Sequence, residues 1–215
     1  MAQNNVLRWQ DGRGWLVLSG GVAVESEIRA RVIERNTADG GVAYISVNTP
    51  EGGTALDDMS DLGAPTGYQV DILTEDDDTI LKSLSEAGIV VLEDTLSSTG
   101  LRSGLQGAAL TGIQAAFERG AMILAEGNSA ALFGSLVASE EGTTAIGLDW
   151  VKRGVILPQI TSIAESKNAQ AILDAEQDAI IIGIGLGSAL ALGPNGEVET
   201  WGERQVTLAL GRAYQ

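Results

Sequence analysis

Short apolar segments alternate with amphipathic ones along most of the chain, and this alternation restricts the fold more than any other feature. The apolar segments have the length of buried strands and end at glycines or polar turns. The predicted strands cover residues 14–19, 42–47, 68–73, 88–92, 121–125, 155–157, 179–184, 189–192 and 205–210. Segments between them carry apolar residues at helical spacing. The predicted helices cover residues 25–36, 79–87, 104–119, 130–137 and 167–175.

Strands that alternate with helices are typical of βαβ units, whose parallel strands are covered on both faces. We therefore predict an α/β fold with a doubly wound, mostly parallel sheet and helices on both faces. Because the 215 residues contain no linker-like tract, we predict a single domain over residues 1–215. Sites in such sheets form outside the carboxyl ends of the strands. The loops of interest are therefore residues 20–21, 93–100 and 127–129.

Charge and composition exclude several function classes. The net charge of −16 disfavours binding to nucleic acid and to anionic membrane surfaces. The acidic run at residues 75–78 could bind a hard cation, but a solvated turn is the favoured interpretation. The chain has no cysteine and no histidine, which excludes thiolate catalysis, Cys–Zn sites and a histidine base. We predict no metal site and no cofactor. With no signal-like or membrane-spanning segment, a cytoplasmic location is the default expectation.

One motif carries possible chemistry. Residues 121–134 read AMILAEGNSAALFG, in which a strand, a turn and a helix follow each other. This resembles the G-x-S-x-G nucleophile elbow, with Ala131 at the second glycine. Ser129 is then the candidate nucleophile, although a serine at the start of a helix is also a common N-cap. The candidate binding residues, which would offer backbone N–H groups, are Gly127, Asn128, Ala130, Gly20 and Gly21.

Several segments in the same order resemble the cyanophycinase and dipeptidase E family of serine peptidases. The resemblance implies a fold like that of the class I glutamine amidotransferases. It covers most of the chain and is distant. Glu25 lies where the family carries an acidic residue. The matching segments are LVLSGG (16–21), AGIVV (87–91), EGNSAALFG (126–134), GLDWVKRGVILPQ (147–159) and GIGLGSALAL (183–192).

The same resemblance shows what this chain lacks. The GGDQ motif of the family is replaced by residues 93–96, Glu-Asp-Thr-Leu. The catalytic histidine of the family falls on Ile160, and its acid falls on or near Ser188. Ser129 is all that remains of the triad, as a vestigial nucleophile. A serine hydroxyl needs an adjacent base, so the loss of the histidine costs orders of magnitude in rate.

Two residues could replace the missing base. Glu126 lies at the end of the strand before Ser129, but its pKa would have to be strongly raised for it to accept a serine proton. Lys152 could form a Ser–Lys pair if burial kept it neutral, although the neighbouring Arg153 favours a solvated segment. A solvated glutamate and a surface lysine are the simpler interpretations.

Two functional hypotheses follow. In the first, the chain is a non-catalytic homologue of cyanophycinase-type peptidases that acts by binding or assembly. In the second, it is a serine hydrolase that uses Ser129 with a non-histidine base. A binding role implies a small-molecule or peptide ligand, which no motif identifies. The resemblance also implies a homodimer, in which the four tryptophans could act as anchors, although they could equally be core residues.

Overall fold

A computed structural model describes residues 6–21, 27–46, 54–94, 98–139 and 143–214. The described residues form two sheets. The larger sheet has the strand order β11-β10-β1-β5-β4-β2-β3, in which β1, β5, β4, β2 and β3 are parallel and β10 and β11 are antiparallel. Its strands are β1 (Trp15–Ser19), β2 (Val42–Ser46), β3 (Gly67–Asp71), β4 (Ile89–Leu92), β5 (Met122–Glu126), β10 (Ser188–Leu192) and β11 (Val198–Gly202).

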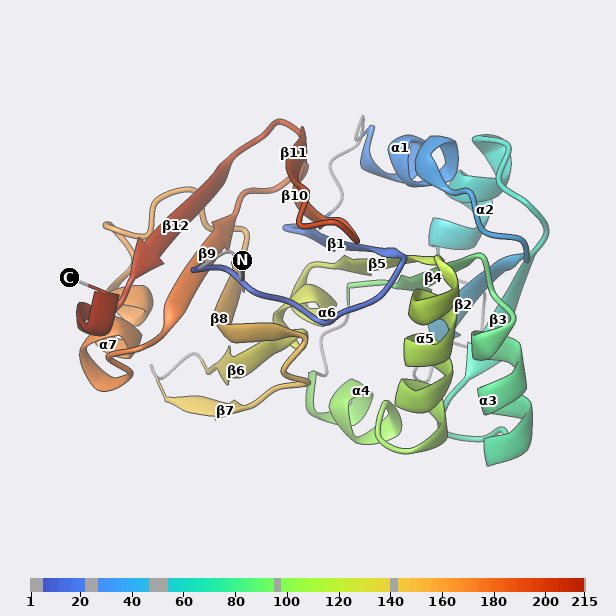
Figure 1. Ribbon diagram of the computed structural model, residues 1–215, viewed down its shortest axis with the longest axis horizontal. Helices are drawn as coiled ribbons and strands as arrows, with labels where there is room; N and C mark the ends of the chain where they lie inside the picture. Colours follow the sequence, from blue (N-terminus) through green and yellow to red (C-terminus); the bar gives the residue numbers. More distant parts are fainter. Residues whose placement is uncertain (1–5, 22–26, 47–53, 95–97, 140–142, 215) are drawn as a thin grey trace.

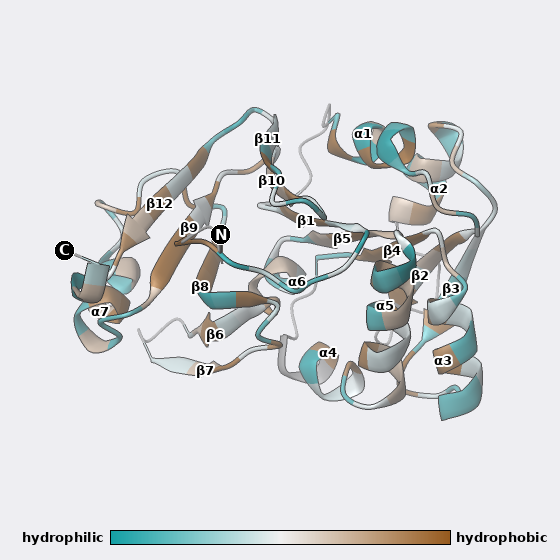
Figure 2. Cartoon of the chain, viewed as in Figure 1, coloured by the Kyte–Doolittle hydropathy of each residue, from teal (hydrophilic) through white to brown (hydrophobic). Residues whose placement is uncertain are grey.

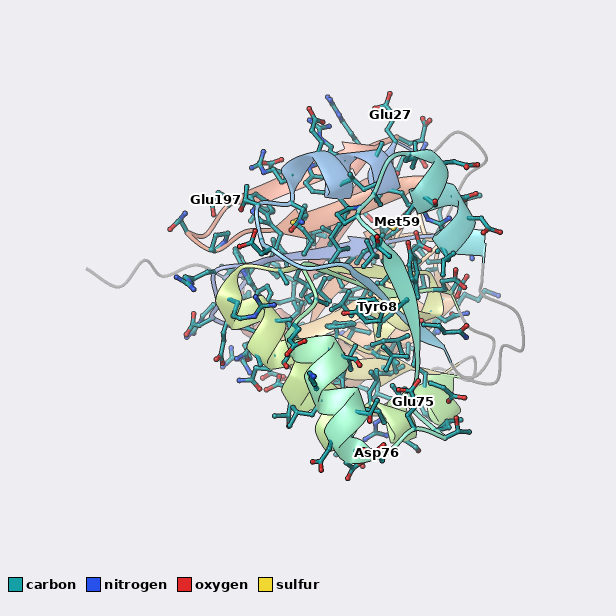
Figure 3. The ribbon with its side chains drawn as sticks, turned by 90° about the vertical axis from the view of Figure 1, so that its right-hand side faces the viewer. Glu27, Met59, Tyr68, Glu75, Asp76 and Glu197 are labelled. Carbon is teal, nitrogen blue, oxygen red and sulfur yellow. The ribbon has the colours of Figure 1, made fainter. Side chains whose placement is uncertain are left out.

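Helices cover both faces of this sheet (Figure 1). The helices α1 (Ile28–Arg35) and α2 (Thr54–Asp61) lie on one face, while α3 (Asp77–Ser85) and α5 (Ala108–Arg119) lie on the other, with α4 (Ser98–Gly104) beside them. Met59 of α2 belongs to the first of these layers and Tyr68 of β3 is packed against the second (Figure 3). This arrangement confirms the predicted doubly wound α/β fold. None of the helices described here has the length and apolar character needed to cross a bilayer.

The second sheet has the order β12-β9-β8-β6-β7 and lies beside the first (Figure 1). Its strands are β6 (Gly134–Ala138), β7 (Thr144–Ile146), β8 (Val151–Pro158), β9 (Ile180–Ile184) and β12 (Val206–Leu210). The helix α7 (Lys167–Ala175) packs on its outer face, and a short 3₁₀ helix (Arg212–Tyr214) follows β12. Ile156, Ile180 and Ile182 point the other way and join the main core. Figure 2 shows β9, the strand of Ile180 and Ile182, largely in brown, the colour of hydrophobic residues.

One predicted helix is wrong, and another begins later than predicted. The helix expected over residues 130–137 is limited to α6 (Asn128–Ala131), and β6 begins at Gly134. A Cβ at Gly134 would lie 2.6 Å from the carbonyl oxygen of Gly154, so the glycine permits β6 to approach β8 closely. The helix expected over residues 104–119 begins only at Ala108, as α5, because Gly107 has a φ of +78° that interrupts the helical backbone between α4 and α5.

The tryptophans do not form a surface patch. Trp15, Trp150 and Trp201 are buried, and half-buried Trp9 donates its indole N–H to the carbonyl of Gly193 at 3.1 Å. Trp15 stacks on Trp201, while Trp150 packs against Phe117 and Phe133. Three of the four tryptophans are therefore core residues rather than anchors, and the homodimer stays a prediction.

The acidic run at residues 75–78 belongs to the start of α3. Asp76 is the N-cap, and its carboxylate accepts the backbone N–H of Thr79 at 3.0 Å (Figure 3). The N-terminal end of a helix favours negative charge, which accounts for the run without a bound cation. Over the residues that the structure describes, no three or more Asp and Glu side chains are grouped so as to hold a metal ion.

Candidate functional site

Three parallel strands bring the predicted site loops to one edge of the larger sheet. In the register of β1, β5 and β4, Ser19 pairs with Glu126 and Leu92 pairs with Ala125. The residues that follow these strands therefore meet at the carboxyl edge. The backbone N–H of Gly127 donates to the carbonyl of Ser19 at 3.0 Å, which joins the first and third loops directly.

The turn between β5 and α6 is formed by Gly127. Its φ of 54° and ψ of −128° lie in a region that residues with a side chain rarely adopt. A Cβ atom at this position would also overlap the carboxylate of Asp94. The sequence placed Ser129 between the strand and the helix. That placement is corrected here, because Gly127 forms the turn and Ser129 lies two residues further along, inside α6.

Ser129 is fully buried, with no exposed surface. Its hydroxyl donates a short hydrogen bond to the backbone carbonyl of Glu93, in the segment that follows β4. It is not the N-cap of α6 either, since Gly127 holds that position. The serine hydroxyl therefore joins α6 to the end of β4 and is not presented at the surface.

Asp94 occupies the space above the turn. Its Oδ1 accepts the backbone N–H of Asn128 at 2.7 Å, and its carboxylate fills the volume that a side chain at Gly127 would need. The N–H that follows an elbow nucleophile is the one that contributes to an oxyanion hole. At this turn the N–H of Asn128, which follows Gly127, takes that place, and it already donates to the carboxylate of Asp94.

The other predicted binding residues also use their N–H groups within the protein. The N–H of Ala130 donates to the carbonyl of Gly127, and that of Gly20 donates to the carbonyl of Ser188, both at 3.0 Å. The N–H of Gly21 donates to Oγ of Ser19 at 3.2 Å, and its φ of +118° requires a glycine. These glycines permit close packing between β1 and the β9–β10 connection.

The positions aligned with the histidine and the acid have other roles. Ser188 is fully buried, and its Oγ accepts the backbone N–H of Gln205 at 3.0 Å. Ile160 follows β8 and is half-buried, with its side chain near Gly183 of β9. Neither side chain can take a proton from a serine at neutral pH.

Glu126 is held in a buried ion pair that was not predicted from the sequence. Its carboxylate accepts Nε of Arg29 at 2.9 Å and Nη2 at 2.6 Å, while Nη1 of Arg29 contacts Asp58 at 2.6 Å. Arg29 and Glu126 are 4% and 2% exposed. Burial raises the pKa of Glu126, while the hydrogen bonds and charge of Arg29 act in the opposite direction. The bidentate pair ties α1 and α2 to the end of β5.

Lys152, the second proposed base, lies at the surface near the start of β8. Its Nζ donates to the backbone carbonyl and to Oδ2 of Asp149, each at 2.8 Å. The hydrogen bond from Lys152, together with one from Ser135, lowers the pKa of Asp149. Lys152 is 46% exposed at its side chain, so its surroundings lack the burial that a neutral lysine requires.

Asp94 and Arg29 are the two residues of this edge that sequence reasoning missed. A signal for Asp94 existed, because it follows β4 at the place where the resemblance has its GGDQ motif. Arg29 adjoins Ile28 on the buried side of α1, and an arginine on the apolar side of a helix is a signal for a buried carboxylate partner.

Known structures are similar to this one in fold. A crystal structure of a peptidase from an acI-B1 Actinobacterium matches with a TM-score of 0.69 and 16% identity, over 94% of this chain and 96% of that one. A candidate peptidase E protein from Listeria monocytogenes EGD-e matches with a TM-score of 0.59 and 16% identity, over 88% of this chain and 98% of that one. No protein-family model matches the chain, and no curated protein sequence does. The likeness establishes a peptidase E-like fold.

Proposed function

We propose that this chain is a non-catalytic relative of the peptidase E-like and cyanophycinase-type serine peptidases, and that it acts by binding or assembly. The proposal depends on the absence of a side chain at Gly127, the residue at the turn between β5 and α6. In a nucleophile elbow, the nucleophile stands on the strained turn between strand and helix, where its side chain projects over the sheet edge. Here that turn has no side chain, and the Asp94 carboxylate fills the space.

The register of the motif changes accordingly. With the nucleophile position at Gly127, the two flanking glycine positions of G-x-S-x-G correspond to Ala125 and Ser129, both of which are small. Ser129 then resembles the second glycine, where a small residue permits close packing. Its burial and its hydrogen bond to Glu93 support this interpretation.

The side chains that could act as a base for a serine also favour a non-catalytic role, because each is absent or held by another residue. The chain contains no histidine, Glu126 is fixed by Arg29, and Lys152 is fixed by Asp149. The carboxylate of Asp94 at the N–H of Asn128 also disfavours a second anionic oxygen there, because two like charges in one small site repel each other. Stabilisation of an oxyanion usually supplies a large part of the rate enhancement in acyl transfer.

A labelling experiment tests the proposal. The purified protein is incubated with a fluorophosphonate probe, beside trypsin as a reactive control, and the products are analysed by intact mass spectrometry. We expect no adduct and no cleavage of Asp-containing peptides or cyanophycin. Stoichiometric labelling that maps to Ser129 and disappears in Ser129→Ala would overturn the proposal. In that case, loss of labelling in Glu126→Gln or Lys152→Met would identify the base.

A further inference from the structure

A pocket of about 300 Å³ lies outside the carboxyl ends of β6 and β8, next to the turn described above. Asn128 and Ala131 of the short helix α6, which lies between the two sheets (Figure 1), belong to its lining. Its apolar walls come from Val137 and Ala138 of β6, Ile156 and Leu157 of β8, and Ala131 of α6. A volume of this size is at the lower end of the range for small-molecule sites. The crevice outside the carboxyl ends of parallel strands is also where α/β sheets bind their ligands.

Polar residues also line this pocket, and they are uncharged. Asn128, Ser139, Ser166 and Asn168 line it together with Ile160, and none of the lining residues that the structure describes is ionisable. This is unusual in a chain with a net charge of −16. Since a charged ligand would need an oppositely charged partner when it loses its hydration, the lining favours an uncharged occupant.

Asn168 is one of the polar residues that line the pocket. Its Nδ2 donates to the backbone carbonyl of Ser139 at 2.9 Å, which connects α7 to the end of β6. Its Oδ1 is buried and lacks a hydrogen-bond partner among the described residues. Because this oxygen is buried, a molecule in the pocket meets other parts of Asn168, which contributes an uncharged polar side chain to the lining.

We infer that this pocket binds a small uncharged molecule with an apolar group about the size of a leucine side chain. A capped, neutral amino-acid residue, such as one within a peptide, has this chemistry. The inference deepens the proposed function, since it names the ligand class for a binding role. The acidic field of the whole chain acts against anionic ligands and so separates this class from aspartate-containing ones.

A titration followed by NMR tests the inference. N-acetyl-leucinamide is added to the ¹⁵N-labelled full chain, and N-acetyl-aspartamide, which carries a free carboxylate, is added to a second sample. We expect saturable shifts at the amides of Ala131, Val137, Ile160 and Asn168, with millimolar affinity. The aspartate compound should bind at least about tenfold more weakly, which corresponds to about 1.4 kcal/mol.

Variants decide whether the pocket is the site. Ala138→Leu fills the pocket, and Ile160→Phe narrows its rim as a second route to the same loss. Each should weaken binding at least fivefold while the remaining spectrum stays folded. Ala145→Leu is the matched control, because Ala145 pairs with Val137 from β7, is exposed and does not line the pocket. It should bind as the unmodified chain does.

The results that would overturn this inference differ from the results of the labelling experiment that would overturn the proposed function. Absence of saturable binding, shifts that lie outside the pocket, equal binding of the two compounds, or unchanged binding in both pocket variants would each overturn the inference. A chain that binds the leucine compound here but reacts at Ser129 would refute the proposed function alone. A chain that is inert towards the probe and does not bind the leucine compound would refute this inference alone.

Discussion

At the scale of single residues, the carboxyl edge depends on a glycine and a carboxylate that occupy one space. Gly127 combines a backbone conformation that excludes most residues with a missing side chain, and Asp94 fills the gap and accepts the N–H of Asn128. Each residue explains the other, because a side chain at position 127 would displace the carboxylate and a smaller residue at position 94 would leave the N–H of Asn128 without this acceptor.

A double-mutant cycle tests this coupling. Gly127→Ser should lower the free energy of unfolding in urea by about 1–3 kcal/mol from backbone strain, plus the cost of the clash with Asp94. Adding Asp94→Gly should remove the clash and leave the strain. Gly63→Ser is the control, since Gly63 has a φ of +84° and no atom within 4 Å of its built Cβ, so it reports strain alone. If Asp94→Gly does not reduce the cost of Gly127→Ser, the two positions are not coupled.

At the scale of elements, the sequence predicted those helices and strands whose apolar residues recur at regular spacing and whose ends are marked by capping or turn residues. The helix predicted over residues 167–175 is α7, which Ser166 caps through the N–H of Ala169. Buried strands such as β1 and β5 were equally readable, because they are continuous apolar runs. The helix α2 was missed, since only Ala55 and Met59 among its described side chains are buried.

The candidate site was less predictable than the fold, for a geometric reason. A helix as short as α6, with four residues, barely exceeds one turn and leaves no periodic signal. The sequence motif was therefore aligned on Ser129. In the structure, the backbone conformation shows that the turn of the motif is at Gly127. The edge strands β7 and β11 were missed as well, because their side chains are partly exposed and their apolar runs are short.

The connection of α1 and α2 to β5 through Arg29 carries an element-scale prediction. Arg29→Met leaves the buried Glu126 carboxylate without its partner, so the free energy of unfolding should fall by about 3–5 kcal/mol. Arg29→Met with Glu126→Leu removes both charges and should recover most of that loss. Arg212→Met is the control, because its ion pair with Asp174 is 68% exposed on each side and should contribute about 0–1 kcal/mol. Equal losses at both arginines in thermal or urea denaturation would argue against a structural role for the buried pair.

At the scale of the whole molecule, the two sheets share one core. One hydrophobic cluster contains residues of both sheets. It includes Leu16 and Ile123 of the larger sheet, Phe117 of α5, and Ile156 and Ile182 of the second sheet. Trp150 lies at the junction, with ring centroids 5.1 Å from Phe117 and 5.3 Å from Phe133. Because neither sheet can separate without exposing this cluster, we expect the chain to unfold as one unit. The single domain over residues 1–215 stays a prediction.

Ile182→Ala tests this cooperativity from inside the second sheet. Ile182 is fully buried in β9, and its truncation should cost about 2–5 kcal/mol through lost burial and the remaining cavity. If the core is shared, tryptophan fluorescence and far-UV circular dichroism should still follow a single transition, shifted by the same amount in both signals. Ile172→Ala in α7, on the outer face of the second sheet, should behave in the same way. If the second sheet were an independent unit, either substitution would make the dichroism transition biphasic. The fluorescence of Trp15 and Trp201, both in the core of the larger sheet, would then keep its original midpoint, because the larger sheet would remain folded after the second had melted.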